Sequence, residues 1–239
     1  MLIDAKDKLF GALNDELCAL QSDVEIENCL GQRFIAAGAR NKRVVINGIP
    51  GNALGAYLAG AEIEVNGNAQ DAVGDTMNDG SIVVHGNVGD AVGYAMRGGV
   101  IYVSGNAGYR AGIHMKEYKS KKPVIIIGGR TGSFLGEYQA GGIIIVLGMH
   151  GDGKPIVGNF PCAGMHGGKV FLRGDASNVS FPCQTTTRPA GEDDWKEIMP
   201  HLLRYCDCFR LDGNSFSRGD FTVVVPNSSN PYKQMYVAN

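Results

Sequence analysis

The first half of the chain repeats itself with a fixed period. Gly48, Gly67, Gly86 and Gly105 are each 19 residues apart, and the segment that starts at Gly67, Gly-Asn-Ala-Gln-Asp-Ala-Val-Gly, returns at Gly86 as Gly-Asn-Val-Gly-Asp-Ala-Val-Gly. Self-similarity at a period of about 20 residues indicates one structural unit stacked repeatedly on its neighbour. The repeat therefore constrains the fold before any single motif does, and residues that recur for stacking are poor candidates for catalysis.

Aliphatic residues precede each repeat glycine at two fixed positions. The glycines taken as anchors are Gly48, Gly67, Gly86, Gly105, Gly128, Gly148 and Gly174. Two residues before them stand Ile46, Val65, Val84, Val103, Ile126, Val146 and Leu172, and four residues before them stand Val44, Ile63, Ile82, Ile101, Val124, Ile144 and Val170. Alternating β-branched residues indicate strands. Because the same face recurs at the same point of every copy, the strands should stack in parallel.

These columns predict an all-β fold, a parallel β-solenoid of about seven coils over residues 24–174, with the fourteen aliphatic side chains pointing inward. Asn68, Asn87 and Asn106 directly follow their glycines. Stacked asparagines can hydrogen-bond along a ladder, and asparagine tolerates the left-handed turn conformation. The asparagines are therefore interpreted as structural.

The two ends of the chain depart from the repeat. Residues 1–23 are expected to form a cap with a helix over residues 12–20, and residues 175–239 an extension with a helix from Glu192 to about Tyr205 and a strand over residues 221–225. The outward positions of the later strands are apolar, and a strand that is apolar on both faces is buried on both faces. We expect the C-terminal extension to cover them. These positions are Ile125, Ile127, Ile145 and Leu147.

Composition excludes several classes of protein. The 22 basic and 24 acidic residues nearly balance, so nothing indicates a nucleic-acid partner. The first residues lack the pattern of a signal peptide, and no run approaches the roughly 18 apolar residues of a membrane span. Six cysteines without an export signal are interpreted as reduced thiols of a cytoplasmic protein.

Catalytic and metal-binding signals are weak. The nucleophile elbow Gly-x-Ser-x-Gly, the dinucleotide motif Gly-x-Gly-x-x-Gly and the Walker sequence are all absent. Cys206 and Cys208 with Cys183 could supply three thiolates to a metal, although buried structural thiols explain them as well. Cys162 and His166 form a candidate nucleophile and base, with ordinary loop residues as the alternative. No catalytic, cofactor-binding or metal residue is therefore predicted beyond these candidates.

The repeats resemble a known family. The segments Gly48–Gly74, Gly86–Gly99, Gly141–Gly148 and Gly164–Val170 are similar to the C-terminal GXGXG repeat domain of the glutamate synthase large subunit, and one of the subunits of formylmethanofuran dehydrogenase has the same repeat. The resemblance implies a right-handed parallel β-helix. In glutamate synthase this element is structural, and it holds the glutaminase domain against the FMN and iron–sulfur synthase domain for ammonia transfer.

The resemblance implies a non-catalytic scaffold subunit of a glutamate synthase-type oxidoreductase complex, with no activity of its own. The expected partners are a glutaminase-type amidotransferase subunit and an FMN-binding synthase subunit, and FMN and the iron–sulfur cluster are expected on these partners rather than on this chain. A homo-oligomer is also compatible with the sequence. Two alternatives stay open: the equivalent repeat-bearing scaffold of a formylmethanofuran dehydrogenase or formyltransferase complex, and an independent Cys-dependent hydrolase that uses Cys162 and His166.

Overall fold

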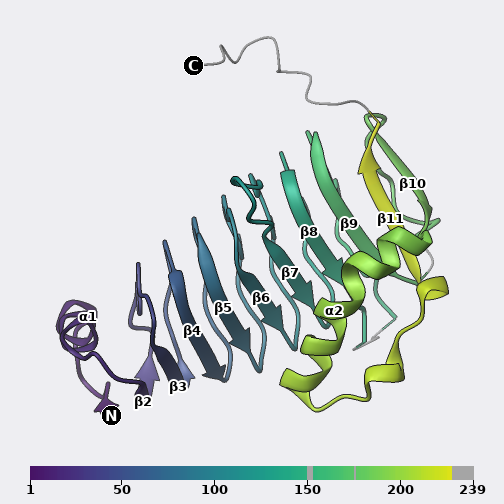
Figure 1. Cartoon of the computed structure of the whole chain (residues 1–239). Helices are drawn as coiled ribbons and strands as arrows, with labels where there is room; N and C mark the ends of the chain where they lie inside the picture. Colours follow the sequence, from purple (N-terminus) through teal and green to yellow (C-terminus); the bar gives the residue numbers. More distant parts are fainter. Residues whose placement is uncertain (150–152, 175, 228–239) are drawn as a thin grey trace.

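The computed structural model describes residues 1–149, 153–174 and 176–227. Within these ranges one sheet contains 11 strands in the order β1-β2-β3-β4-β5-β6-β7-β8-β9-β11-β10 (Figure 1). The first nine strands pair in parallel, each with the next along the chain. They are β1 (Leu2–Asp4), β2 (Val24–Leu30), β3 (Arg43–Ile49), β4 (Ala59–Asn66), β5 (Asp79–Val84), β6 (Val100–Val103), β7 (Val124–Ile127), β8 (Ala140–Val146) and β9 (Gly167–Arg173).

This architecture confirms the predicted all-β parallel solenoid. The seven predicted strands correspond to β3 through β9, and β1 and β2 lengthen the stack at the N-terminal end. Because β1 lies inside the segment predicted as a cap, the sheet begins earlier than expected. Twelve of the fourteen predicted aliphatic residues lie in the hydrophobic interior of the solenoid.

The two exceptions, Val124 and Ile126, correct the predicted register of β7. Its interior positions are Ile125 and Ile127, which pair with Ile101 and Val103 of β6. Strand β7 reads Val-Ile-Ile-Ile, so both alternations satisfy the aliphatic pattern and the sequence could not decide between them. The predicted anchor Gly128 is therefore wrong by one residue.

Gly129 is the residue that continues the glycine ladder. The Gly105 N–H donates to the Gly86 carbonyl at 2.9 Å, the Gly129 N–H donates to Gly105 at 2.8 Å, and the Gly148 N–H donates to Gly129 at 2.9 Å. Backbone groups of successive coils thus satisfy one another, which is what permits these turns to be buried against each other.

The asparagine ladder is present in the form of side chain to backbone bonds. Asn68 Oδ1 accepts from the backbone N–H of Asn87 at 2.8 Å, and Asn87 Oδ1 accepts from the N–H of Asn106 at the same distance. Asn106 Oδ1 in turn accepts from the N–H of Arg130 at 2.9 Å. Each asparagine therefore caps a turn of the following coil.

The ends of the solenoid are built differently. At the N-terminal end lies helix α1 (Phe10–Ala19), with Leu13 and Leu17 buried. At the C-terminal end the chain reverses direction: β11 (Phe221–Pro226) pairs antiparallel with β9, and β10 (Thr185–Pro189) pairs antiparallel with β11. Helix α2 (Glu192–Phe209) connects β10 to two 3₁₀ turns, Gly213–Ser215 and Arg218–Asp220.

Helix α2 lies across the outer face of the later strands, as Figure 1 shows. It continues through Pro200 beyond the predicted end at Tyr205 and stops at Arg210, whose φ is 56°. The C-terminal tail thereby covers the apolar outer face, as expected, although Val124 and Ile126 replace Ile125 and Ile127 there. A second hydrophobic cluster includes Val124, Ile126, Ile143, Ile145, Leu147, Phe171, Ile198, Leu202 and Tyr205.

The close approach of the coils yields a prediction for Gly86. A Cβ atom at this position would lie 2.7 Å from the Gly67 carbonyl oxygen and also against Asn68 Oδ1. Gly86→Ala should therefore lower the free energy of unfolding by at least about 2 kcal/mol, because the ladder must open to admit the methyl group. Urea-induced unfolding measures this change.

Gly219→Ala is the matched control, because a Cβ atom there meets nothing within 4 Å. It should change the free energy of unfolding by no more than about 0.5 kcal/mol. Equal stabilities for the two variants would show that the coils are not packed as described.

Candidate functional site: the groove beside helix α2

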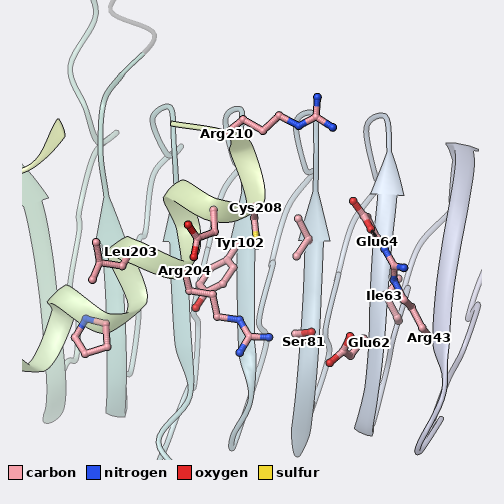
Figure 2. A pocket seen from close by; sticks show the side chains of 13 residues that line it. Arg43, Glu62, Ile63, Glu64, Ser81, Tyr102, Leu203, Arg204, Cys208 and Arg210 are labelled. Carbon is pink, nitrogen blue, oxygen red and sulfur yellow. Dashed lines mark hydrogen bonds and ion pairs between the residues drawn. The ribbon is translucent and has the colours of Figure 1, made fainter. Parts of the chain in front are cut away.

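A groove of about 980 Å³ lies where the C-terminal half of α2 meets the open part of the sheet. One wall comes from α2 and the other from β3 and β4, with β5 and β6 between them (Figure 2). The lining residues are Arg43, Glu62, Ile63, Glu64, Ser81, Val83, Tyr102, Pro200, Leu203, Arg204, Asp207, Cys208 and Arg210.

An ionic clamp at its first turn fixes α2 over the sheet. The Asp194 carboxylate accepts from Lys169 Nζ of β9 at 2.7 Å, from Arg188 of β10, and from the backbone N–H of Gly191 at 2.9 Å. The Arg188 guanidinium, together with these other donors, holds the pKa of Asp194 well below its usual range. Glu197 also bonds to Lys169, at 2.8 Å. The start of α2 is thus tied to the last strands.

Two tyrosines fix the other half of the helix. Tyr205 is fully buried and donates its hydroxyl to the Val103 carbonyl at 3.2 Å, and its ring meets the edge of Tyr102 with centroids 6.0 Å apart. A side chain at Gly128 would overlap both the Tyr205 hydroxyl and the backbone carbonyl oxygen of Ser104, so this glycine makes room for α2 and for the preceding coil. Burial raises the pKa of Tyr102 to about 12, and its hydroxyl has no hydrogen-bond partner among the described residues.

The charges of the groove are balanced. Glu64 accepts from Arg43 Nη2 at 2.6 Å and contacts His85 Nε2 at 3.0 Å, and these hydrogen bonds, that of His85 first, lower the pKa of Glu64. Arg204 and Arg210 extend from the α2 wall opposite the acidic residues of β4, as Figure 2 shows. Such a surface suits polar recognition, but it brings together no nucleophile with an activating base.

The predicted metal candidates do not converge. Cys183 is exposed in the segment before β10, Cys206 is buried and Cys208 is half-buried on α2. Burial raises the pKa of both Cys206 and Cys208. Among the residues that the structure describes, no three histidine, cysteine, aspartate or glutamate side chains are grouped so that they could hold a metal ion. Only Cys208 of the three lines the groove.

Cys162 is a core residue. Its side chain is fully buried in the solenoid interior, and burial alone raises its pKa to about 12. Its backbone N–H donates to Leu135 in the way that Gly136 donates to Ala111 one coil earlier, so it occupies a position of the repeat that glycine holds in the coils just before it. The Nδ1 atom of His166 lies 3.0 Å from the Gly164 carbonyl oxygen. This environment disfavours a thiolate nucleophile at Cys162.

The groove itself was not predicted from the sequence. Its two walls lie far apart in the chain, as the bond between Tyr205 and Val103 illustrates, with a separation of 102 residues. The only local signal was the change of the outward strand positions from Glu62 and Glu64 to the aliphatic residues of β7 and β8. That change marks the boundary between the part of the sheet that α2 covers and the part that it leaves uncovered.

The repeat has a counterpart in known proteins. The profile of the GXGXG motif family matches residues 21–187, which is most of the chain. The chain belongs to this family. The matched range includes β2 through β9, so family membership rests on the stacked coils.

Two similar proteins add to this assignment. An uncharacterized protein of Methanocaldococcus jannaschii, MJ1350, is 41% identical over 250 residues, covering 99% of this chain and 96% of the relative. Among solved structures, a chain of the formyltransferase/hydrolase complex from Methylorubrum extorquens, determined with methylofuran, is similar with a TM-score of 0.59 and 19% identity, covering 80% of this chain and 68% of the other. At this identity the likeness concerns the fold.

The Asp194 clamp predicts how stability depends on pH. Because the pKa of folded Asp194 lies below its unfolded value of 3.8, the clamp contributes fully above about pH 4 and its contribution is lost as the pH falls further. Asp194→Asn should lower the free energy of unfolding at pH 7 by about 2–3 kcal/mol and flatten its decline below pH 4. Thermal unfolding monitored between pH 3 and pH 7 tests this.

Glu192→Gln serves as the control on the same helix. Glu192 is exposed, and its partner among the residues that the structure describes is Lys196, at 3.4 Å. Its replacement should change stability by less than about 0.5 kcal/mol. If Asp194→Asn behaved like this control, the clamp would not position α2.

The burial of Cys162 predicts its reactivity. In the native protein a water-soluble disulfide reagent should label the exposed Cys18 and Cys183 and leave Cys162 unmodified until the chain unfolds. Peptide mapping after timed labelling identifies the modified thiols. Rapid labelling of native Cys162 would instead restore it as a candidate nucleophile.

Proposed function

We propose that this protein is a scaffold subunit of a multi-subunit enzyme complex, with catalysis carried out by its partners. The observation that carries the proposal is that the repeated polar groups form hydrogen bonds between successive coils. The asparagine side chains and the backbone of the glycine turns bond to the next coil, as in Asn87 to Asn68, and the aliphatic columns fill the interior. The recurring residues are thus committed to stacking, and the solenoid offers long outer surfaces for partners.

The finer assignment is to a glutamate synthase-type complex of the cytoplasm. It is supported by the resemblance of the repeats to the C-terminal repeat domain of the glutamate synthase large subunit, and the six free thiols are in keeping with a reducing compartment. A glutaminase-type subunit and an FMN-binding subunit with an iron–sulfur cluster would then be the partners. The chain would hold them together so that ammonia passes between their sites.

A second candidate is favoured by one observation. The similar chain from Methylorubrum extorquens belongs to a formyltransferase/hydrolase complex. A scaffold role in a complex of that type would use the same solenoid, with different catalytic subunits on its outer surfaces. Both assignments share the scaffold role and differ in the partners.

Purification of the tagged chain from its native cells distinguishes the assignments. We expect a glutaminase-type subunit and an FMN-binding subunit in stoichiometric amounts, identified by mass spectrometry and by the flavin absorbance. Formyltransferase and hydrolase subunits would select the second candidate. A chain that elutes alone from a native extract would overturn the scaffold proposal itself.

A further inference from the structure

A tyrosine hydroxyl on the floor of the groove beside α2 lacks a hydrogen-bond partner among the described residues. Tyr102 lies on the outer face of β6 and is 0% exposed. Because burial keeps this phenol protonated, the unpartnered group is a hydrogen-bond donor. An unpaired buried donor is costly to the free protein. An acceptor atom of a ligand would therefore be stabilised at this point of the groove.

The helix wall places a cation beside this hydroxyl. Burial raises the pKa of Tyr102 and the charge of Arg204 opposes that rise, so the two groups are close. Figure 2 likewise shows the two side chains next to each other. Arg204 is exposed and forms no ion pair within the described part of the chain. A phenol and a guanidinium that lie together are suited to a carboxylate, which accepts from both.

A ligand that bonds to the Tyr102 hydroxyl must first move a side chain, because the hydroxyl is covered in the free protein. Arg204 is the neighbour that is free to rotate, since it is exposed and no ion pair with a described residue holds it. The backbone beneath it is fixed: the adjacent Tyr205 is buried and bonded to the Val103 carbonyl. The groove therefore opens at this point by rotation of one side chain, without movement of α2.

The two walls of the groove carry opposite net charge. On the α2 wall two arginines and one aspartate leave a net charge of +1, and on the strand wall two glutamates and one arginine leave −1. These residues are Arg204, Arg210 and Asp207 on α2, and Glu62, Glu64 and Arg43 on the strands. Arg43 already pairs with Glu64, which leaves Glu62 as the anion open to a ligand. A polyanion or a polycation would be repelled by one wall, whereas a zwitterion complements both.

The spacing of the strands sets the length of such a ligand. Glu62 pairs with Ser81 of β5, and Val83 of β5 pairs with Tyr102. Two strand spacings therefore separate the backbones of Glu62 and Tyr102, which is at least about 10 Å. An α-amino acid, whose charged groups are one carbon apart, is too short to reach both. A longer zwitterion fits, and the groove volume of about 980 Å³ is ample for it.

We propose that this groove binds a small zwitterion whose carboxylate and ammonium groups are separated by a chain of several atoms. The carboxylate accepts from the Tyr102 hydroxyl and the Arg204 guanidinium, and the ammonium group donates to Glu62. The chain between them lies over Ser81 and Val83 of β5. This site goes beyond the proposed scaffold function and does not depend on it, because the residues of this chain alone form it.

Titration of the full chain with δ-aminovalerate, followed by ligand-observed NMR, tests the site. Valerate and pentylamine each keep one charged end of this probe, and glycine keeps both ends but brings them close together. We expect δ-aminovalerate to bind at least about tenfold more tightly than any of the three, because it alone reaches both walls. Equal affinity for valerate, or no binding of δ-aminovalerate at millimolar concentration, would overturn the proposal.

The variant Tyr102→Phe removes the hydroxyl and keeps the ring. It should weaken the binding of δ-aminovalerate by about tenfold or more, because a hydrogen bond to a charged group is lost. Without ligand it should unfold at or above the wild-type temperature, since the hydroxyl has no partner to lose. A marked fall in that temperature would show that the hydroxyl is already bonded in the free protein, and the argument for the site would fail.

The charge on the helix wall is tested separately. Arg204→Gln should weaken the binding of δ-aminovalerate by about tenfold, because the carboxylate loses its cationic donor. Lys196→Gln is the matched control: Lys196 lies on the same helix outside the groove and pairs with Glu192 at 3.4 Å. It should leave the affinity unchanged. If the two variants bound the probe equally well, the α2 wall would not hold the carboxylate. The scaffold role would stand, because the co-purified subunits test it.

Discussion

The structure depends on hydrogen bonding between successive coils in a fixed register. Each turn donates backbone N–H groups to the turn before it, as Gly105 does to Gly86 and Gly129 to Gly105, and the asparagine side chains add a bond at the same point. Parallel pairing of this kind leaves no local hairpin to hold a strand in place, so the register is set by the turns and the interior columns together. The early repeats have a uniform period in the sequence because this register must be kept from coil to coil.

The polarity of the outer sheet face determines where helix α2 packs. The outward residues of β4 are Glu62 and Glu64, whereas β7 and β8 present aliphatic residues outward. Helix α2 covers the apolar part, fixed by Asp194 at one end and Tyr205 at the other. Because a single helix covers only part of the sheet, a groove forms at the boundary. Its balanced charges follow from its position between a polar strand and the polar side of a helix.

The sequence predicted the interior columns of β3–β6, β8 and β9 correctly and failed at β7. The early columns and the asparagine ladder are confirmed because each coil repeats the spacing of the last. In β7 the preceding insertion changes the spacing, and an unbroken aliphatic strand hides the correct alternation, which is why Gly128 was mistaken for Gly129. The groove and the tyrosine contacts under α2 join residues as far apart as Val103 and Tyr205, and no local pattern encodes that separation.

Positions of the repeat also differ in how strongly the structure constrains their side chains. Inward positions and turn glycines are constrained by neighbours on both sides, so a change there is felt along the stack. The left-handed turn positions on the edge are constrained in backbone conformation but not in side-chain size: Ala53, Ala72, Arg110 and Phe134 share one of them, with φ values from 56° to 64°. Such positions can carry a surface for recognition without disturbing the coils. A solenoid of this design can thus acquire different partners while its interior and its ladders stay the same, and its surface residues rather than its repeats identify what it binds.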